Sequence, residues 1–274
     1  MLSHKQELQN LPQSRLNSHS FKSRLIPSFL ALSVMSALYS PLSANWTINK
    51  SDTQNETQSI DATISSNITL NSKHPAISTT QSGSGQLSSL TIQDGVTIRV
   101  NVNCGYDCGH GVLIDKGTSI NSITNNGHIN TQRTGIIVKG KAETITIAKQ
   151  GRITTPVSSA IHVFENATVN HINMAGNLFG FGIRNFGTIG ASGQVSSPNG
   201  IKITGTINSP NNRAPSIENR GTIHGGIKIE DGATIGLMIY NAGVINGGIS
   251  IKDSTVNANK LLVVCHPLKQ EISP

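Results

Sequence analysis

From about residue 111 onward, short aliphatic pairs alternate with turn-forming residues along the chain. The clearest phrases have the form Gly-Ile-x-Ile, as in Gly135-Ile-Ile-Val138 and Gly226-Ile-Lys-Ile229. The two aliphatics of each phrase are two positions apart, so they point to one face of a β-strand and the residue between them points to the other. Gly, Asn and Asp separate the phrases, and these residues suit tight turns and positive φ. No window between the phrases has the length of an amphipathic helix, so the pattern predicts short strands joined by turns.

The phrases recur with a regular period. Two adjacent copies, Asn219–Ile229 and Asn241–Ile251, begin 22 residues apart. Looser copies precede them, and the starts at 111, 135, 160, 200, 226 and 248 give spacings of 24, 25, 40, 26 and 22. The longest spacing contains an extra partial copy, Phe181–Ile189, and predicts an irregular rung beside it.

A coil of about 22 residues with three short strands is one rung of a parallel β-helix. Stacked rungs pair each strand with its neighbours above and below, and their inward Ile side chains form continuous columns. We therefore predict an all-β fold, a parallel β-helix solenoid of 22–25-residue rungs, with six or seven rungs between residues 90 and 258. Leucine-rich repeats have a similar period, but they require a Leu-rich consensus and a fixed Asn ladder, and here Ile dominates and Leu is scarce.

The N-terminus has the three-part layout of a secretory signal peptide. A polar, basic segment ends at Arg24, and Leu25–Tyr39 form a fifteen-residue apolar run. Small residues follow as far as Ala44, which is the expected cleavage position. The apolar run is short for a membrane span, although an uncleaved anchor or a buried helix are alternatives. We assign residues 1–44 to the signal peptide.

The next segment, residues 45–90, is rich in Ser, Thr, Asn and Gln. It could be a polar lead-in or an N-terminal cap, with possible strands at 60–64, 68–70 and 87–92. The repeats proper are expected over 91–258.

Composition narrows the class of protein further. Charged residues make up 13% of the chain and aromatic residues 4%, whereas globular proteins average roughly 25% charged residues. The low charge and regular Ile argue against disorder. Of the net charge of +7, +3 lies in the first 44 residues, where four cationic residues face Glu7. A nucleic-acid partner is not predicted, because a clustered basic face with base-stacking aromatics is not evident.

The phrase Asn-x-Gly-x-Ile-x-Gly-Gly-Ile-x-Ile, with Ala-Thr-Ile turns between copies, resembles the passenger domains of Gram-negative autotransporters. The resemblance is one of repeat style over residues 45–258. It implies export through the inner membrane and display at the cell surface or outer membrane, or release, in a structural or adhesive role. The implied partners are a host-cell or extracellular surface ligand and a C-terminal β-barrel translocator. A toxin-like or pore-forming passenger is a further possibility, without a membrane-active segment in its favour.

The C-terminal end departs from that family. A translocator barrel of some 250 residues should follow the passenger, but composition changes abruptly near Lys260 and the tail at 259–274 begins no such pattern. We expect a truncated or frameshifted product or a fragment, which would be periplasmic if the barrel is truly absent. Downstream coding sequence without further repeats or barrel strands would contradict this expectation.

Cys104 and Cys108, with His110, form the most site-like local cluster. A disulfide between the two cysteines is favoured in an exported protein, with free thiols and a metal site as the alternatives. Zinc usually requires four ligands, so we predict no metal and no cofactor. The histidines are scattered over different repeat positions and are expected at the surface; they are His110, His128, His162, His171 and His224.

β-Helices also occur in polysaccharide lyases and glycoside hydrolases, whose sites need converging carboxylates. Aligned on Gly-Ile-x-Ile, several acids and lysines fall at the same turn of the repeat and predict one mixed-charge, solvated corner rather than an active site. These residues are Asp115, Glu165, Glu230, Asp231, Asp253, Lys116, Lys139 and Lys252. We therefore predict no catalysis, with a β-helical carbohydrate-active enzyme as the alternative.

Two interruptions of the repeat are candidates for ligand contact, the loops at 104–110 and 174–186. Phe179, Phe181 and Phe186 cluster in sequence at the second of them. They predict either an interaction loop or an irregular rung with its aromatic rings stacked inside.

Overall fold

The computed structural model describes residues 46–47, 59–79, 86–102, 108–192, 200–209, 214–236 and 238–256. Every regular element within these ranges is a β-strand, and all the strand pairs are parallel. The predicted all-β parallel β-helix is confirmed. The described part of the chain contains no helix with the length and hydropathy of a membrane span.

The strands form three parallel sheets, here named A, B and C. Sheet A contains β1 (Trp46–Thr47), β4 (Ile77–Thr79), β7 (Val112–Ile114), β10 (Ile136–Val138), β13 (Ile161–Val163), β16 (Ile183–Asn185), β20 (Ile217–Asn219) and β24 (Ile239–Asn241). Sheet B contains β2 (Ser59–Ile64), β5 (Gln86–Ile92), β8 (Ser119–Asn125), β11 (Lys141–Ile147), β14 (Thr168–Met174), β17 (Thr188–Ile189), β18 (Gly200–Ile203), β21 (Thr222–Ile223), β22 (Ile227–Ile229), β25 (Val244–Ile245) and β26 (Ile249–Ile251). Sheet C contains β3 (Ile68–Leu70), β6 (Thr97–Val100), β9 (His128–Thr131), β12 (Arg152–Thr154), β15 (Asn177–Phe179), β19 (Thr206–Asn208), β23 (Thr234–Ile235) and β27 (Thr255–Val256).

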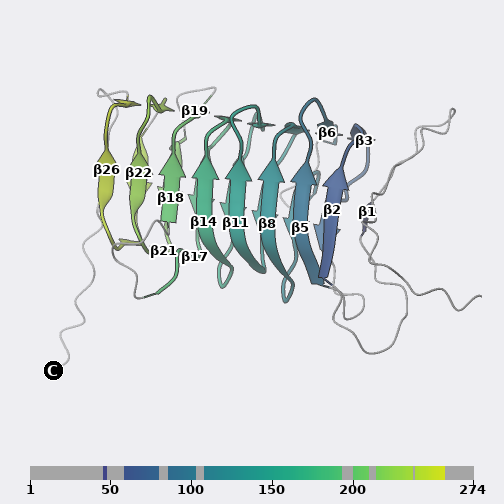
Figure 1. Cartoon of the computed structure of the whole chain (residues 1–274), viewed down its shortest axis with the longest axis horizontal. Helices are drawn as coiled ribbons and strands as arrows, with labels where there is room; N and C mark the ends of the chain where they lie inside the picture. The colour runs from purple at the N-terminus through teal and green to yellow at the C-terminus, as the bar shows by residue number, and fades with distance from the viewer. Residues whose placement is uncertain are drawn as a thin grey trace, which may run out of the picture. The chain divides into compact units, whose positions relative to one another are not determined.

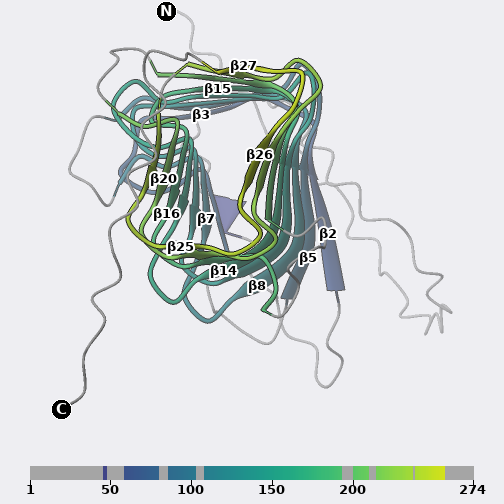
Figure 2. The same cartoon turned by 90° about the vertical axis from the view of Figure 1, so that its left-hand side faces the viewer.

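Successive rungs stack in sequence order. The strands of sheet B lie side by side from β2 to β26 (Figure 1), and a view along the stack shows the three sheets on three sides of a common interior (Figure 2). Register is kept from rung to rung, since Ile136 of β10 pairs with Val112 on one side and Ile161 on the other. Equivalent residues therefore form columns that run along the stack.

The interior consists mainly of aliphatic columns. In sheet C one column is fully buried in each successive strand, and its members are Ile98, Ile129, Ile153, Leu178, Ile207 and Ile235. A buried Ile contributes roughly 1.5–3 kcal/mol relative to an exposed one. A rung buries only a few of them, so stability depends on the stacking of neighbours.

Sheet B divides in the later rungs. The first half of β14 pairs with β17 and the second half with β18. In the next two rungs a Gly-Gly pair at positive φ separates β21 from β22 and β25 from β26. The close stacking excludes a side chain here, because a Cβ at Gly226 would lie 2.5 Å from the carbonyl oxygen of Gly248.

The six Gly-Ile-x-Ile phrases that were aligned on the sequence are not equivalent in the structure. The phrases beginning at 111, 135 and 160 lie in sheet A, whereas those at 200, 226 and 248 lie in sheet B. The Ile-x-Ile alternation is the same for every inward-facing strand, so it cannot distinguish one sheet from another. The spacing of 40 thus contains a change of sheet. The partial copy inside it forms a regular strand of sheet A, because β16 pairs in register with β13 and β20.

One interior column of sheet A changes from aliphatic to amide. Its members in β7, β10 and β13 are Ile or Val, and in β16, β20 and β24 they are Asn185, Asn219 and Asn241. All three are buried. Each side-chain amide bonds to the next one, with Nδ2···Oδ1 distances of 2.8 and 2.7 Å. This asparagine ladder satisfies amides that would otherwise be buried without partners.

The parallel pairing begins upstream of residue 91. The strands expected at 60–64, 68–70 and 87–92 are confirmed as β2, β3 and β5, and they belong to the same sheets as the later repeats. The segment 45–90, expected to be either a polar lead-in or an N-terminal cap, therefore contributes strands to the stack. The predicted signal peptide at 1–44 and the tail at 259–274 lie outside the described residues.

Candidate interaction surface on sheet A

The outward side chains of sheet A change in chemistry along the stack. The central residue of each strand faces outward, since its two neighbours fill the interior. These residues are Leu113, Ile137, His162, Arg184, Glu218 and Tyr240, in the order β7, β10, β13, β16, β20 and β24. The first two are aliphatic, whereas the last four carry rings or charges.

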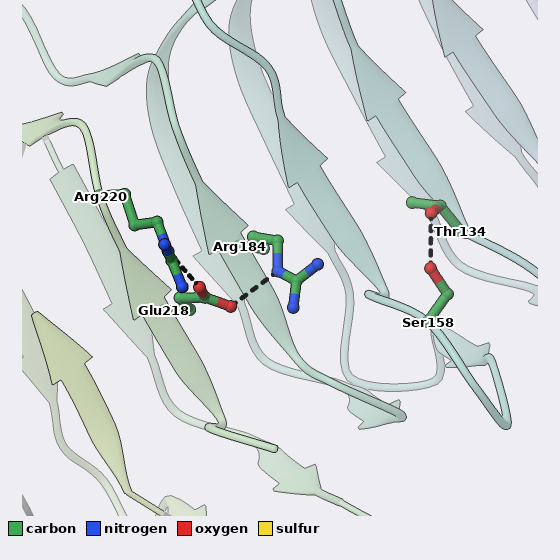
Figure 3. Close-up of polar contacts among 5 residues, drawn as sticks. All are labelled: Thr134, Ser158, Arg184, Glu218 and Arg220. Carbon is green, nitrogen blue, oxygen red and sulfur yellow. Dashed lines mark hydrogen bonds and ion pairs between the residues drawn. The ribbon is translucent and has the colours of Figure 1, made fainter. Parts of the chain in front are cut away.

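Glu218 lies between two arginines on this face (Figure 3). Its Oε2 accepts from Nε of Arg184 at 2.8 Å, and its Oε1 accepts from Nε of Arg220 at 2.6 Å. The Glu218 side chain is only 7% exposed, against 31% for Arg184 and 52% for Arg220. The hydrogen bond to Glu218, followed by its charge, raises the pKa of Arg220. A buried carboxylate thus fixes two partly solvated guanidinium groups.

Three rings pack beside this arrangement. His162 stacks on Phe164 with ring centroids 4.1 Å apart and meets the Phe186 ring at 5.4 Å. Burial, followed by the positive charge of Arg184, lowers the pKa of His162 to about 4. His162 is therefore neutral near pH 7 and acts as an aromatic ring.

The cations on this face lie over the rings. Lys139 Nζ is 5.2 Å from the Phe164 centroid. The Cζ of Arg184 is 5.9 Å and that of Arg220 5.6 Å from the Phe186 centroid, and Arg220 is also 5.8 Å from Tyr240. These distances fall within the range of cation–π attraction. We call the set the aromatic–cationic band; its members are Lys139, His162, Phe164, Arg184, Phe186, Glu218, Arg220 and Tyr240.

A pair of hydroxyl groups lies in the turns before two earlier strands of sheet A. Thr134 Oγ1 and Ser158 Oγ are 2.9 Å apart and connect the turns that precede β10 and β13 (Figure 3). The pair joins two successive rungs at the N-terminal ends of their sheet A strands.

The three phenylalanines predicted to form an interaction loop are distributed over two sheets. Phe179 ends β15 in sheet C and is 40% exposed. Phe181 lies in the connection to β16, where its amide donates to the carbonyl of Ser158. Phe186 follows β16 and belongs to the aromatic–cationic band. The alternative of rings stacked inside the rung is wrong, because the columns of sheets A and C are filled by aliphatic, Asn and Thr side chains, and none of the three rings is buried.

The cysteine cluster is only partly described. Cys108 is disulfide-bonded and buried. Cys104, its predicted partner, lies outside the described residues, so the pairing stays a prediction. His110 is 4% exposed, which corrects the expectation that the histidines lie at the surface. It is covered because its carbonyl accepts from the amide of Ala76 and this turn packs against the preceding rung.

The charged corner predicted from the repeat is divided between two places. Asp115 follows β7 of sheet A, whereas Glu230 and Asp253 follow β22 and β26 of sheet B. The error has the same cause as the misaligned repeats. Among the described residues no three His, Cys, Asp or Glu side chains are placed to hold a metal ion.

No protein family model, no curated protein and no solved structure matches the chain. The observed class, a parallel β-helix of stacked rungs, therefore rests on the strand pairing alone.

Proposed function

We propose that this protein is an exported cell-surface β-helix of the autotransporter-passenger type, with a structural and adhesive role and no catalysis of its own. Its ligand would be a component of a host-cell or extracellular surface, contacted by the aromatic–cationic band. The observation that carries the proposal is the ordered arrangement of that band on the strands of one sheet.

The band suits adhesion because its supports are rigid. Its central residues stand on strands that are paired on both sides, and the side chains beneath them are buried. Rings and cations also restrain each other, so little side-chain freedom is left to lose when a ligand binds. Aromatic residues and Arg are the side chains that most often dominate protein binding energies.

Export is supported by two features. The first 44 residues have the layout of a signal peptide. Cys108 is disulfide-bonded, and disulfides persist mainly in oxidising compartments such as the periplasm and the cell exterior.

A non-catalytic role is supported by the partners of the carboxylates. Glu218 is held by two arginines, and Glu230 forms an ion pair with Lys202 at 2.6 Å. Asp115 accepts from the amide of Lys116 in its own turn. The alternative, a β-helical glycan-cleaving enzyme, would need a pair of carboxylates facing one sugar. Assays for reducing ends released from polysaccharides distinguish the two.

Two measurements test the proposal on the full chain produced in a Gram-negative host. We expect the exported protein to begin at Asn45 when its N-terminus is sequenced. We also expect the purified protein to be retained on cultured epithelial cells or on extracellular matrix.

A matched pair of variants locates the contact. Phe186→Ala/Tyr240→Ala removes two rings of the band and should reduce retention, whereas Phe179→Ala removes an exposed ring of sheet C and should leave it unchanged. Absence of retention by the unaltered protein, or equal retention by both variants, would contradict the proposal.

A further inference from the structure

We propose that the aromatic–cationic band binds an acidic polysaccharide, carboxylated or sulfated, that lies along the axis of the stack. The inference rests on the proposed adhesive function and specifies the chemistry of its ligand.

The charge of the band favours an anion. Lys139, Arg184 and Arg220 supply three positive charges and Glu218 one negative charge, which leaves a net charge of +2. His162 adds none near neutral pH because its pKa is lowered to about 4, chiefly by burial. A polyanion gains from such a cluster along its whole length, since every cation can meet a separate acidic group.

The arginines can recognise carboxylate or sulfate oxygens. Both use Nε toward Glu218, and the terminal nitrogens of Arg184 point away from that carboxylate (Figure 3). Guanidinium Nη groups bind carboxylate and sulfate-like oxygens in pairs. Glu218 therefore acts as a positioning residue that holds both guanidinium groups through Nε and leaves the terminal nitrogens of Arg184 turned away from its own carboxylate.

The spacing of the cations suits a linear polymer. Arg184 stands two strands beyond Lys139 in sheet A, and Arg220 follows the next strand. With neighbouring strands about 4.8 Å apart, the cations lie roughly 10 Å and 5 Å from one another along the stack. A polysaccharide carries its acidic groups at intervals set by its sugar rings, which are of similar length.

A lipid surface fits the band less well. Membrane-binding surfaces combine cations with apolar side chains that enter the bilayer. The large hydrophobic side chains that are exposed among the described residues are Val157, Phe179, Val244 and Ile251. None of them belongs to the band.

Sheet B supplies a matched control. Lys202 and Lys228 face outward from the paired strands β18 and β22 and are exposed. Removing these two charges changes the net charge as much as removing Arg184 and Arg220. A difference between the two double variants therefore reports on the site and not on overall electrostatics.

The test measures binding of the full chain to immobilised dextran sulfate and polygalacturonate, with neutral dextran as the reference polymer. We expect binding to both acidic polymers, weakened by salt, and no binding to dextran. Arg184→Gln/Arg220→Gln should weaken the affinity roughly tenfold or more, and Lys202→Gln/Lys228→Gln by less than about threefold. Arg184→Lys/Arg220→Lys, which keeps the charge and can still pair with Glu218, should fall between them because the planar fork is lost.

A further variant protects the test against misfolding. Lys139→Gln leaves the pairing of Glu218 intact and should still weaken binding several-fold. Equal losses in the Arg→Gln and Lys→Gln double variants would overturn the proposal. So would equal binding to dextran, or binding to phosphatidylglycerol vesicles that depends on the arginines while dextran sulfate binding does not. Retention on cells without binding to either acidic polymer would overturn this inference alone, whereas polymer binding without retention on cells would count against the adhesive function.

Discussion

Asn185 donates from Nδ2 to Oδ1 of Asn219 at 2.8 Å, and this hydrogen bond joins two neighbouring rungs on the inner face of sheet A. Asn219 in turn donates to Asn241 and to the carbonyl of Val244. The ladder therefore joins side chains and turn backbone over three successive rungs. It replaces aliphatic burial where the later rungs turn from sheet A into sheet B.

Removal of the central amide should disturb both neighbours. We expect Asn219→Ala to lower the free energy of unfolding by about 2–4 kcal/mol, because the three hydrogen bonds of its side chain are lost and buried polar groups are left unpaired. Asn177→Ala, at the exposed start of β15, should stay within about 0.5 kcal/mol of the unaltered protein. Urea unfolding followed by circular dichroism measures both changes. A loss at Asn219 no greater than that at Asn177 would show that the ladder does not support the stack.

Truncation of an interior Ile should cost the most stability where a rung covers it on both sides. Ile145 is fully buried in β11, and Ile251 in β26 is 41% exposed, although Ile229, its partner in the preceding strand, is fully buried. Ile145→Ala should cost about 2–5 kcal/mol, and Ile251→Ala under about 1.5 kcal/mol. The same urea experiment tests the pair, and similar costs at the two positions would contradict the observed order of rungs.

Acid should destabilise the band through His162. Its pKa is lowered from 6.5 to about 4, chiefly by burial and then by Arg184, while the negative charge of Glu218 acts in the opposite direction. The unfolded chain therefore binds a proton between pH 6.5 and 4 that the folded chain does not, and stability falls as the pH is lowered through this window. The contribution is up to about 3 kcal/mol.

His162→Gln should flatten the dependence of unfolding free energy on pH between 6.5 and 4. Other acidic groups affect both proteins alike, so the difference between the two curves isolates the histidine. Parallel curves over this window would show that His162 is not held neutral by the fold.

Removal of the buried Glu218 charge should destabilise the protein more than removal of the better-solvated Glu230 charge. Glu218→Gln removes the charge that fixes Arg184 and Arg220, and we expect it to cost about 1–2 kcal/mol of stability. The matched variant is Glu230→Gln, which breaks the more exposed ion pair with Lys202 and should behave almost like the unaltered protein. Thermal unfolding measures the melting temperatures of both variants, and Glu218→Gln should have the lower one. Equal melting temperatures would remove the structural role given to Glu218.

The fold could be predicted because its signal is repeated many times. Each Ile-x-Ile phrase is weak alone, but its recurrence near 22 residues leaves few alternatives to a solenoid. The assignment of phrases to sheets could not be predicted in the same way. Gly135-Ile-Ile-Val138 and Gly226-Ile-Lys-Ile229 have the same alternation, yet they occupy sheets A and B.

The candidate site was largely missed because its members are far apart in sequence. His162, Arg184 and Glu218 belong to three rungs and become neighbours only through the register of sheet A. The asparagine ladder did leave a signal. The phrase Ile-x-Asn-x-Gly recurs from Ile183, Ile217 and Ile239, and an Asn at an otherwise inward aliphatic position indicates a buried amide column.

Residue-resolved amide hydrogen exchange of the full chain tests the stacked β-helix most directly. The account predicts slow exchange in all three sheets, strongest in central strands such as β11 and β14, and rapid exchange in the exposed turns between them. Uniformly rapid exchange across residues 59–256, or protection confined to one sheet, would contradict the stack and with it the surface that the band requires.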